Sequence, residues 1–473
     1  MQAELFASDQ KTHRFNVPKV ATKQLKIATA GDVRKLRVSS NLLPMFGFNA
    51  GQRIGINKIS NGVEITFDDA GRQKIYERKY NSRRNSPCEA ILELKNAEVM
   101  AQFPKHVSRF SVEMRHGNVK LRQLLDRAFS ARKALRQLAN PTTMFAALTS
   151  GVDIHAAQQL GFDIAGIVEL RKQEARDRTD LTETGVLTAV ANNNIGAIFN
   201  EDIYNLDWSK VADTLDIPHV PVLHCSLSCD AFSTLSSGKY AEIGLETDRD
   251  MAFSLLDGIK RLEPSMVIVE QVPAFAKSAE YQLFRLQLQR MGYYITEKIM
   301  DARDYGDITS RKRFHMIASF YPGATLPEPT PRRTTPVWDE FIAPHLSECR
   351  DITHSKSITD GEKSGRLRIV DKHKTYSNTP VKSCYRMAND TLCLEHEGRF
   401  LLPSEKLRKV LLSIPTDFNT DVVGETIASE IIGQSISYGM HHQILACVKN
   451  HILENVGHCT VSTLKTTQQT QIA

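Results

Sequence analysis

Short apolar segments alternate with longer helical stretches from Thr142 to Ser319, and this alternation limits the possible folds more than any other feature of the chain. Strands separated by stretches long enough for a helix are typical of parallel pairing. The predicted strands are residues 144–148, 164–168, 197–199, 220–224, 266–269 and 314–318. The sequence therefore predicts an α/β fold with a doubly wound, mostly parallel sheet and helices on both faces.

The first 138 residues predict a separate, β-rich module. Asn61-Gly62 and Gly117-Asn118 each stand between two strand-like segments and are typical of hairpin turns. From Arg72 to Arg136 there are 16 Lys or Arg residues and 6 Asp or Glu residues. This excess of positive charge predicts a surface that binds DNA phosphates. The alternatives are an ordinary solvated surface and a module that joins two copies of the chain as a homodimer.

The middle of the chain interrupts the α/β pattern. Residues 321 to about 381 are rich in Pro, Thr and charge and show little periodicity, and helical patterns return from residue 399. We therefore expect one domain built from residues 139–320 and 399–455, interrupted by a separate region at 321–398. Residues 456–473 are expected to form a flexible tail.

Cysteine usage and hydropathy exclude several classes of protein. Eight cysteines spread thinly over 473 residues argue against a disulfide scaffold. Cys225 and Cys229 could form half of a zinc site, but no second close pair lies near them, and we expect no metal. No apolar run reaches the roughly 20 residues that span a bilayer, and the first residues lack the apolar core of a signal peptide. We therefore expect a cytoplasmic protein without a membrane partner.

Polar residues follow the predicted strands at their carboxyl ends, where doubly wound sheets bind ligands. The first strand runs into Leu148-Thr149-Ser150, the second ends at Glu169, and the third is followed by Asp202-Ile203. A carboxylate in the position of Glu169 can accept both hydroxyl hydrogens of a ribose, which favours a nucleoside ligand; strand-end capping is the alternative. Cys229 follows the fourth strand, and a thiolate there suits a nucleophile.

The order of these signals resembles the DNA cytosine-5 methyltransferase family over residues 142–450. CDAFS, which contains Cys229, is similar to the nucleophile loop of the family, and Glu270-Gln-Val is similar to its Glu-Asn-Val motif. SRKRF places Arg311 and Arg313 where the family has paired arginines. LLPSEKLRKVLLSIPTDF and IIGQSI, which contains Gln434, resemble the last two motifs. The chain looks like a divergent bacterial member of the plasmid or phage type, which implies a place in restriction–modification.

The resemblance implies a Rossmann-like class I methyltransferase fold and transfer of a methyl group from S-adenosylmethionine to C5 of cytosine in double-stranded DNA. It implies that Cys229 attacks C6 of a flipped-out base, that Glu270 stabilises charge at N3, and that paired arginines position O2 and support the loop. The implied catalytic residues are Cys229, Glu270, Arg311 and Arg313. The residues assigned to the cofactor are Phe145, Leu148, Thr149, Ser150, Glu169, Asp202, Ile203 and Gln434. A DNA substrate also implies association with the nucleoid.

Several motif positions depart from the family pattern. The first loop has no glycine from Phe145 to Ser150, Ser228 replaces a proline, Thr309 replaces a glutamine, and Gln271 and Gln434 replace asparagines. Two alternatives therefore stay open: a related enzyme that methylates transfer RNA, and a degenerate DNA-binding protein without catalysis. The basic amino-terminal module favours DNA over transfer RNA, and the intact Cys, Glu and Arg set argues against the degenerate protein.

The resemblance assigns the reading of the target sequence to the region at residues 321–398. Its second half already resembles the frame around the last motifs, which leaves residues 327–370 for contacts with bases. The candidate readers are Arg332, Arg333, Arg350, Lys363, Arg366 and Arg368. Reading base edges takes a few well-placed side chains. So short a region therefore predicts a short or relaxed target sequence.

Overall fold

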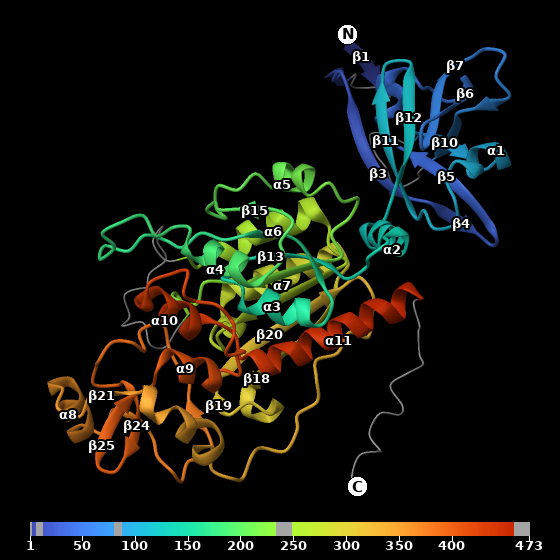
Figure 1. The fold of residues 1–473 in the computed structure, drawn as a ribbon. Helices are drawn as coiled ribbons and strands as arrows, with labels where there is room; N and C mark the ends of the chain where they lie inside the picture. Colours follow the sequence, from blue (N-terminus) through green and yellow to red (C-terminus); the bar gives the residue numbers. More distant parts are fainter. Residues whose placement is uncertain (1, 6–12, 80–87, 233–247, 458–473) are drawn as a thin grey trace, which may run out of the picture. The chain divides into compact units, whose positions relative to one another are not determined.

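The computed structural model describes residues 2–5, 13–79, 88–232 and 248–457, and it divides the chain into two compact units, Met1–Ser130 and Ala131–Ala473 (Figure 1). The division falls within the helix α2 (Arg127–Gln137), a little before the predicted boundary at residue 138. Residues 458–473, which make up most of the predicted tail, lie outside the described residues.

The first unit is built mainly from strands, as the sequence predicts. Its strands are β1 (Gln2–Leu5), β2 (His13–Asn16), β3 (Ala21–Lys26), β4 (Ala28–Ala30), β5 (Val33–Ser39), β6 (Arg53–Ile59), β7 (Gly62–Phe67), β8 (Gln73–Lys74), β9 (Tyr76–Lys79), β10 (Cys88–Leu94), β11 (Arg109–Arg115) and β12 (Asn118–Leu124). They form sheets in the orders β3-β11-β12-β7-β6-β8, β4-β5-β10-β9 and β1-β2. The short helix α1 (Ala97–Ala101) follows β10.

Both predicted hairpins of this unit are confirmed. β6 and β7 pair antiparallel around Asn61, which adopts the left-handed backbone conformation that an Asn-Gly turn requires. β11 and β12 pair antiparallel from Arg109 opposite Leu124 to Arg115 opposite Asn118. Alternate residues of β11 point into an apolar core, because successive side chains of a strand face opposite sides of the sheet.

The second unit is centred on a sheet with the strand order β15-β14-β13-β16-β17-β20-β18 (Figure 1). The strands are β13 (Thr143–Ala147), β14 (Asp163–Val168), β15 (Ile198–Phe199), β16 (Val222–Ser226), β17 (Met266–Gln271), β18 (Tyr294–Asp301) and β20 (Lys312–Ser319). Neighbouring strands pair in parallel except at β20, which is antiparallel to both neighbours. In chain order this is 3-2-1-4-5-7-6 with a reversed seventh strand, which agrees with the doubly wound, mostly parallel sheet that the sequence predicts.

One strand of this sheet, β18, is absent from the sequence-based expectation. It lies at the edge of the sheet and its residues are mostly polar or exposed. An edge strand that packs little against the core shows neither an apolar run nor strict alternation, so periodicity does not reveal it.

Helices cover both faces of the central sheet, as predicted. The helices of this unit include α3 (Val152–Gln159), α4 (Thr184–Asn192), α5 (Trp208–Leu215), α6 (Met251–Leu262), α7 (Ala279–Met291), α10 (Glu425–Gln434) and α11 (Tyr438–Val456). The helix α9 (Glu405–Leu411) packs instead against the smaller sheet described below. On one face α3 and α11 pack against Ala146, Val222 and Ile268 in a continuous apolar cluster. On the other face Phe145 packs against Trp208 of α5.

The region between the central sheet and α9 forms a second, smaller sheet with the order β21-β25-β24-β22. Its strands are β21 (Arg350–Asp351), β22 (Arg368–Val370), β24 (Leu392–His396) and β25 (Arg399–Leu402), and the helix α8 (Lys356–Lys363) lies in the same region. β25 pairs with both β24 and β21. The small sheet therefore continues to Leu402, past the expected boundary at residue 398, because a cut there would divide the hairpin of β24 and β25.

Among the described residues, the longest helices are too polar or too short to cross a membrane.

Candidate active site

The carboxyl ends of β14, β13, β16 and β17 lie next to one another at one edge of the central sheet. The strand register aligns Ala147 with Val168 and with Cys225, and it aligns Ser226 with Glu270. The loops that follow these strands therefore emerge side by side. This edge carries residues 148–150 and Glu169 on the β13 and β14 side, and Cys229 and Glu270 on the β16 and β17 side.

The loop after β13 keeps its shape without the glycines that the family pattern has there. Leu148 adopts a left-handed backbone conformation with φ of 61°, and its N–H donates to the carbonyl of Val168. The Thr149 hydroxyl donates to the carboxylate of Asp153 in α3 and accepts the N–H of Gly151 at 3.0 Å. Thr149 is buried and Ser150 is half-buried. Side-chain hydrogen bonds thus hold the backbone of this loop.

Gly151 makes the close approach of α3 to the neighbouring helix α4 feasible. Its φ is 107°, and a Cβ atom at this position would lie 2.7 Å from Cα of Ala189. The one glycine of the loop therefore stands where both backbone conformation and space require it.

Phe145 is fully buried, with its ring centroid 6.1 Å from those of Phe199 and Trp208. With no exposed surface, this ring forms part of the packing under the sheet edge. Direct contact between Phe145 and a cofactor stays a prediction.

Glu169 is half-buried at the end of β14, and its carboxylate has no hydrogen-bond or ion-pair partner in the part of the chain that the structure describes. Burial, together with the charge of Asp153, raises its pKa to about 8. Gly185 leaves no room behind this side chain, since a Cβ atom there would lie 2.6 Å from Oε1 of Glu169. Such a carboxylate suits a ligand that donates hydrogen bonds, as a ribose diol does.

The other residues predicted for the cofactor follow Glu169 in the chain. Asp202 is half-buried after β15, and its Oδ1 accepts the N–H of Tyr204 at 3.1 Å. Ile203 is buried, with 3% of its surface exposed. The side chain of Gln434 is exposed at the end of α10.

The nucleophile loop after β16 is held by a residue of the neighbouring strand. The amide of Gln271, at the end of β17, donates to the carbonyls of Ser228 at 2.7 Å and Leu227 at 3.3 Å. Its Oε1 accepts the N–H of Val272 at 2.6 Å. Gln271 replaces the asparagine of the family motif, and the sequence alone gave no sign that it anchors this loop.

The half-buried Cys229 follows this anchor directly. The N–H of Phe232 donates to its carbonyl at 3.1 Å and closes a turn. Burial, with the charge of Asp230, raises the pKa of the thiol, while Arg313 and Arg311 act in the opposite direction. Ser233, the last residue of the predicted motif, lies outside the described residues.

Glu270 and Arg313 form an ion pair beside this loop. Nε of Arg313 lies 2.9 Å from Oε1 of Glu270, and the Glu270 side chain is 10% exposed. Oε1 of Glu270 makes no hydrogen bond to any described residue, because the N–H of Arg313 is not aimed at it. The carboxylate is therefore buried beside a guanidinium and still able to bond to a ligand.

Arg311 contacts the protein backbone. Its buried guanidinium donates to the carbonyls of Pro380, Gly433, Gln434 and Ser435. Burial, with the charge of Arg313, lowers its pKa to about 9. The resemblance implies that the paired arginines position O2 of the base and support the loop. The hydrogen bonds of Arg311 to backbone carbonyls fit the second of these roles.

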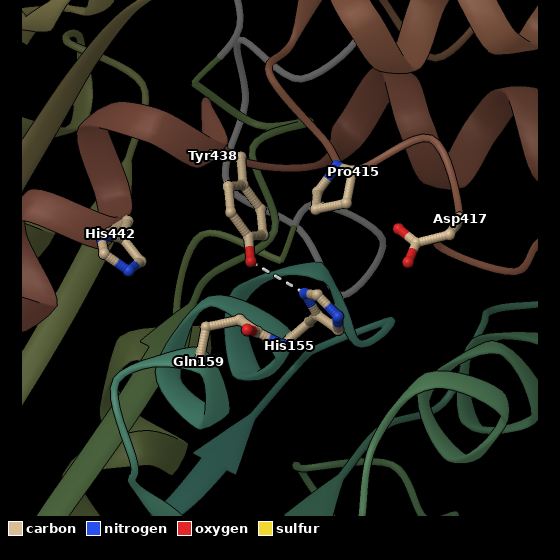
Figure 2. Close-up of a pocket in the computed structure, with 6 residues that line it drawn as sticks. All are labelled: His155, Gln159, Pro415, Asp417, Tyr438 and His442. Atoms are coloured by element: carbon tan, nitrogen blue, oxygen red, sulfur yellow. Dashed lines mark hydrogen bonds between the residues drawn. The ribbon is translucent and has the colours of Figure 1, made fainter. Parts of the chain in front are cut away.

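A separate pocket of about 340 Å³ lies between α3, α11 and the segment after α9 (Figure 2). His155, Gln159, Pro415, Asp417, Tyr438 and His442 line it. His155 Nδ1 lies 2.8 Å from the Tyr438 hydroxyl. None of the residues predicted for catalysis or the cofactor lines this pocket. Across the described ranges, no group of three His, Cys, Asp or Glu side chains is arranged to hold a metal ion.

Residues 160–383 match the family model of C-5 cytosine-specific DNA methylases. The Type II methyltransferase M.MspI of Moraxella sp. is 22% identical over 219 residues, which are 45% of this chain and 52% of that protein. The match thus spans about half the length of this relative.

Two solved structures are similar at lower identity. A methyltransferase of Entamoeba histolytica is 14% identical, with a TM-score of 0.49 over 66% of this chain and 98% of that one. The Dnmt2 methyltransferase of S. pombe is 15% identical, with a TM-score of 0.47 over 66% of this chain and 98% of that one. Over residues 160–383, the chain is therefore similar to the C-5 cytosine-specific DNA methylase family.

Proposed function

We propose that this protein transfers a methyl group from S-adenosylmethionine to C5 of cytosine in double-stranded DNA, through a covalent bond between Cys229 and the base. The observation that carries this proposal is the convergence of the Cys229 loop with the Glu270–Arg313 pair, at the adjoining ends of β16 and β17. A thiol can attack a ring carbon, and a carboxylate with a guanidinium can stabilise the charge that the attack produces.

The residues on the β13 and β14 side fit S-adenosylmethionine. Glu169 offers a carboxylate without a protein partner among the described residues, which suits the ribose hydroxyls. Asp202 follows the next strand and would face the adenine, while Leu148, Thr149 and Ser150 would border the methionine part. When bound, S-adenosylmethionine supplies an electrophilic methyl group.

Cys229 rests as a thiol, because burial and Asp230 raise its pKa. Arg313 and Arg311 favour the thiolate, which is the attacking form. The thiolate adds to C6 of a base that has left the duplex, and the electron pair of the C5–C6 bond makes C5 nucleophilic. Glu270 holds N3 and stabilises the ring. Once C5 carries the methyl group, loss of its proton expels the thiolate and restores the ring.

The small sheet and its surroundings are proposed to read the target sequence. Some of the candidate side chains are less available for DNA, because they already pair with other protein groups. Arg332 pairs with Asp304, and Arg333 pairs with Glu340. Arg368 donates to the carbonyls of Asp390 and Thr379. Arg350, Lys363 and Arg366 are exposed and have no side-chain partner among the described residues. These three are therefore the best placed to contact bases or phosphates.

The amino-terminal unit is proposed to bind DNA phosphates through the outer face of β3, β11, β12 and β7. The strand register places on this face Lys26, Arg109, Arg115, Lys120 and Arg122, against Glu64 and Glu113. Ion pairs join Arg115 and Arg122 to Glu113, and Lys120 to Glu64. Because the basic side chains on this face outnumber its carboxylates, the face keeps a net positive charge, which favours a polyanion. Homodimer formation through this unit is the alternative role.

Replacement of the nucleophile tests the central proposal. Cys229→Ser should lower the rate of methyl transfer to duplex DNA by roughly 10³-fold or more, because a hydroxyl is far less ionised and less nucleophilic than a thiol. The measurement is transfer of a radioactive methyl group from S-adenosylmethionine. Cys447→Ser, at a half-buried thiol in α11, is the matched control and should keep its activity. Near-normal activity of Cys229→Ser, or methylation of transfer RNA in place of DNA, would contradict the proposal.

The pKa of Glu169 predicts how cofactor affinity depends on pH. The free protein holds this carboxyl protonated below about pH 8, and only the ionised form accepts both ribose hydroxyls. Affinity for S-adenosylhomocysteine should therefore rise as the pH increases through 8, and in Glu169→Gln it should be weaker and independent of pH over this range. Calorimetry from pH 6.5 to 9 measures this. A flat profile for the unaltered protein would show that Glu169 does not contact the ribose.

The charged face of the amino-terminal unit predicts a change in the salt dependence of DNA binding. Arg109→Ala combined with Arg122→Ala should make the plot of log K against log salt shallower, by roughly one unit of slope for each lost phosphate contact. Fluorescence anisotropy of a labelled duplex at several salt concentrations gives this slope. Arg37→Ala, on β5 of the other sheet, is the control and should leave it unchanged. Equal slopes for all variants would favour the alternative role, which sedimentation would then examine.

A further inference from the structure

A layer of buried polar side chains lies under the cofactor loop, between the central sheet and the helices α3 and α11. It consists of Asp153 on α3, His224 on β16, His315 on β20 and His441 on α11, none more than 6% exposed. The ring centroid of His441 lies 4.9 Å from that of His224 and 6.4 Å from that of His315. Buried polar groups are costly unless they are paired, so this layer calls for an explanation.

Asp153 is the charged member of the layer, and His224 is its partner. Oδ2 of Asp153 lies 3.1 Å from Nδ1 of His224, which is ion-pair distance, although neither atom makes a hydrogen bond to a described residue. Burial alone would raise the pKa of the Asp153 carboxyl, but His224 and Thr149 outweigh it and hold this pKa below its ordinary value. Burial lowers the pKa of His315 to about 3 and also lowers that of His441, so both of these rings are neutral.

The other oxygen of Asp153 faces the cofactor loop. Oδ1 accepts the hydroxyl of Thr149 and the N–H of Ile154, and the Thr149 hydroxyl in turn accepts the N–H of Gly151. A continuous contact therefore runs from His224 in the strand that leads to Cys229, through Asp153, to the loop after β13. Where the family pattern has glycines, hydrogen bonds from the side chains of Thr149 and Asp153 hold the loop of this chain.

We propose that Asp153 and His224 are a positioning pair that fixes the cofactor loop through Thr149, in place of the glycines that this loop lacks. This inference rests on the proposed function, since it concerns the same cofactor. The pair touches neither cofactor nor base; it sets the backbone of residues 148–151, against which the methionine part of the cofactor lies.

The groups that face Asp153 come from every element packed around it. They are His224 of β16, His441 of α11, Thr149 of the loop and, through charge, Cys225 of β16 and Glu169 after β14. His224 alone among them lies within ion-pair distance of the carboxylate. Replacement of either member of the pair should therefore release the loop.

Equilibrium binding and steady-state kinetics of the full chain test this inference. Asp153→Asn and His224→Asn should each weaken binding of S-adenosylhomocysteine roughly tenfold, the effect of losing one bond to a charged group. KM for S-adenosylmethionine should rise similarly while kcat at saturation stays nearly unchanged, because uniform binding is lost. His155→Asn is the matched control. It lies on the same helix, and its ring lines the pocket, where it bonds to Tyr438 (Figure 2).

A milder pair of variants covers the case in which a change at Asp153 prevents folding. Thr149→Val removes the hydroxyl at nearly constant volume and should weaken binding as Asp153→Asn does, whereas Thr149→Ser keeps the hydroxyl and should restore it. If Asp153→Asn or Thr149→Val binds S-adenosylhomocysteine as tightly as the unaltered protein, the inference is overturned and the proposed function still stands. If the unaltered protein binds none, the proposed function fails and the inference fails with it.

The pH profile supplies a readout that general loss of structure would not move. Because the charge of Asp153 contributes to the raised pKa of Glu169, Asp153→Asn should shift the midpoint of the binding profile to lower pH. Thr149→Val leaves that charge in place and should keep the midpoint. An unshifted midpoint in Asp153→Asn would contradict the placement of Asp153 beside the cofactor site.

Discussion

The parallel pairing of β16 with β17 is the constraint on which the rest of the active site depends. It places Ser226 opposite Glu270, so the Cys229 loop and the Glu270 carboxylate leave the sheet at the same point. Gln271 then ties that loop to the end of β17 through the carbonyls before Cys229. A shift in this register by one residue would turn every side chain to the opposite face and separate the thiol from the carboxylate.

A second set of contacts holds the carboxyl-terminal helices near this edge of the sheet. Asp307 accepts hydrogen bonds from the hydroxyls of Ser413 and Ser437 and from the N–H of Met440. Arg311 donates to the carbonyls at the end of α10, from Gly433 to Ser435. One short segment before β20 therefore holds both parts of the chain that follow the small sheet. This explains how a domain interrupted by about 80 residues still closes around a single site.

The features predictable from the sequence are those that depend on local periodicity and on motif order. The alternating strands and the hairpin turn at Asn61 needed no distant contacts, whereas β18 was missed because an edge strand has no core-facing pattern. In the sequence Gln271 is only a departure from the family motif, because the carbonyls that its amide contacts lie in the loop after another strand, β16. The Asp153–His224 pair could not be predicted from the sequence either, because its members are distant in sequence and belong to no motif.

The central claim is a covalent bond between Cys229 and cytosine, and trapping tests it most directly. Duplex DNA that contains 5-fluorocytosine cannot release the adduct after methyl transfer, because fluorine replaces the proton that must leave C5. Incubation with S-adenosylmethionine, protease digestion and mass spectrometry should identify a peptide in which Cys229 carries the methylated, fluorinated base. Absence of any adduct while methylation of ordinary DNA proceeds, or an adduct on another residue, would contradict this account.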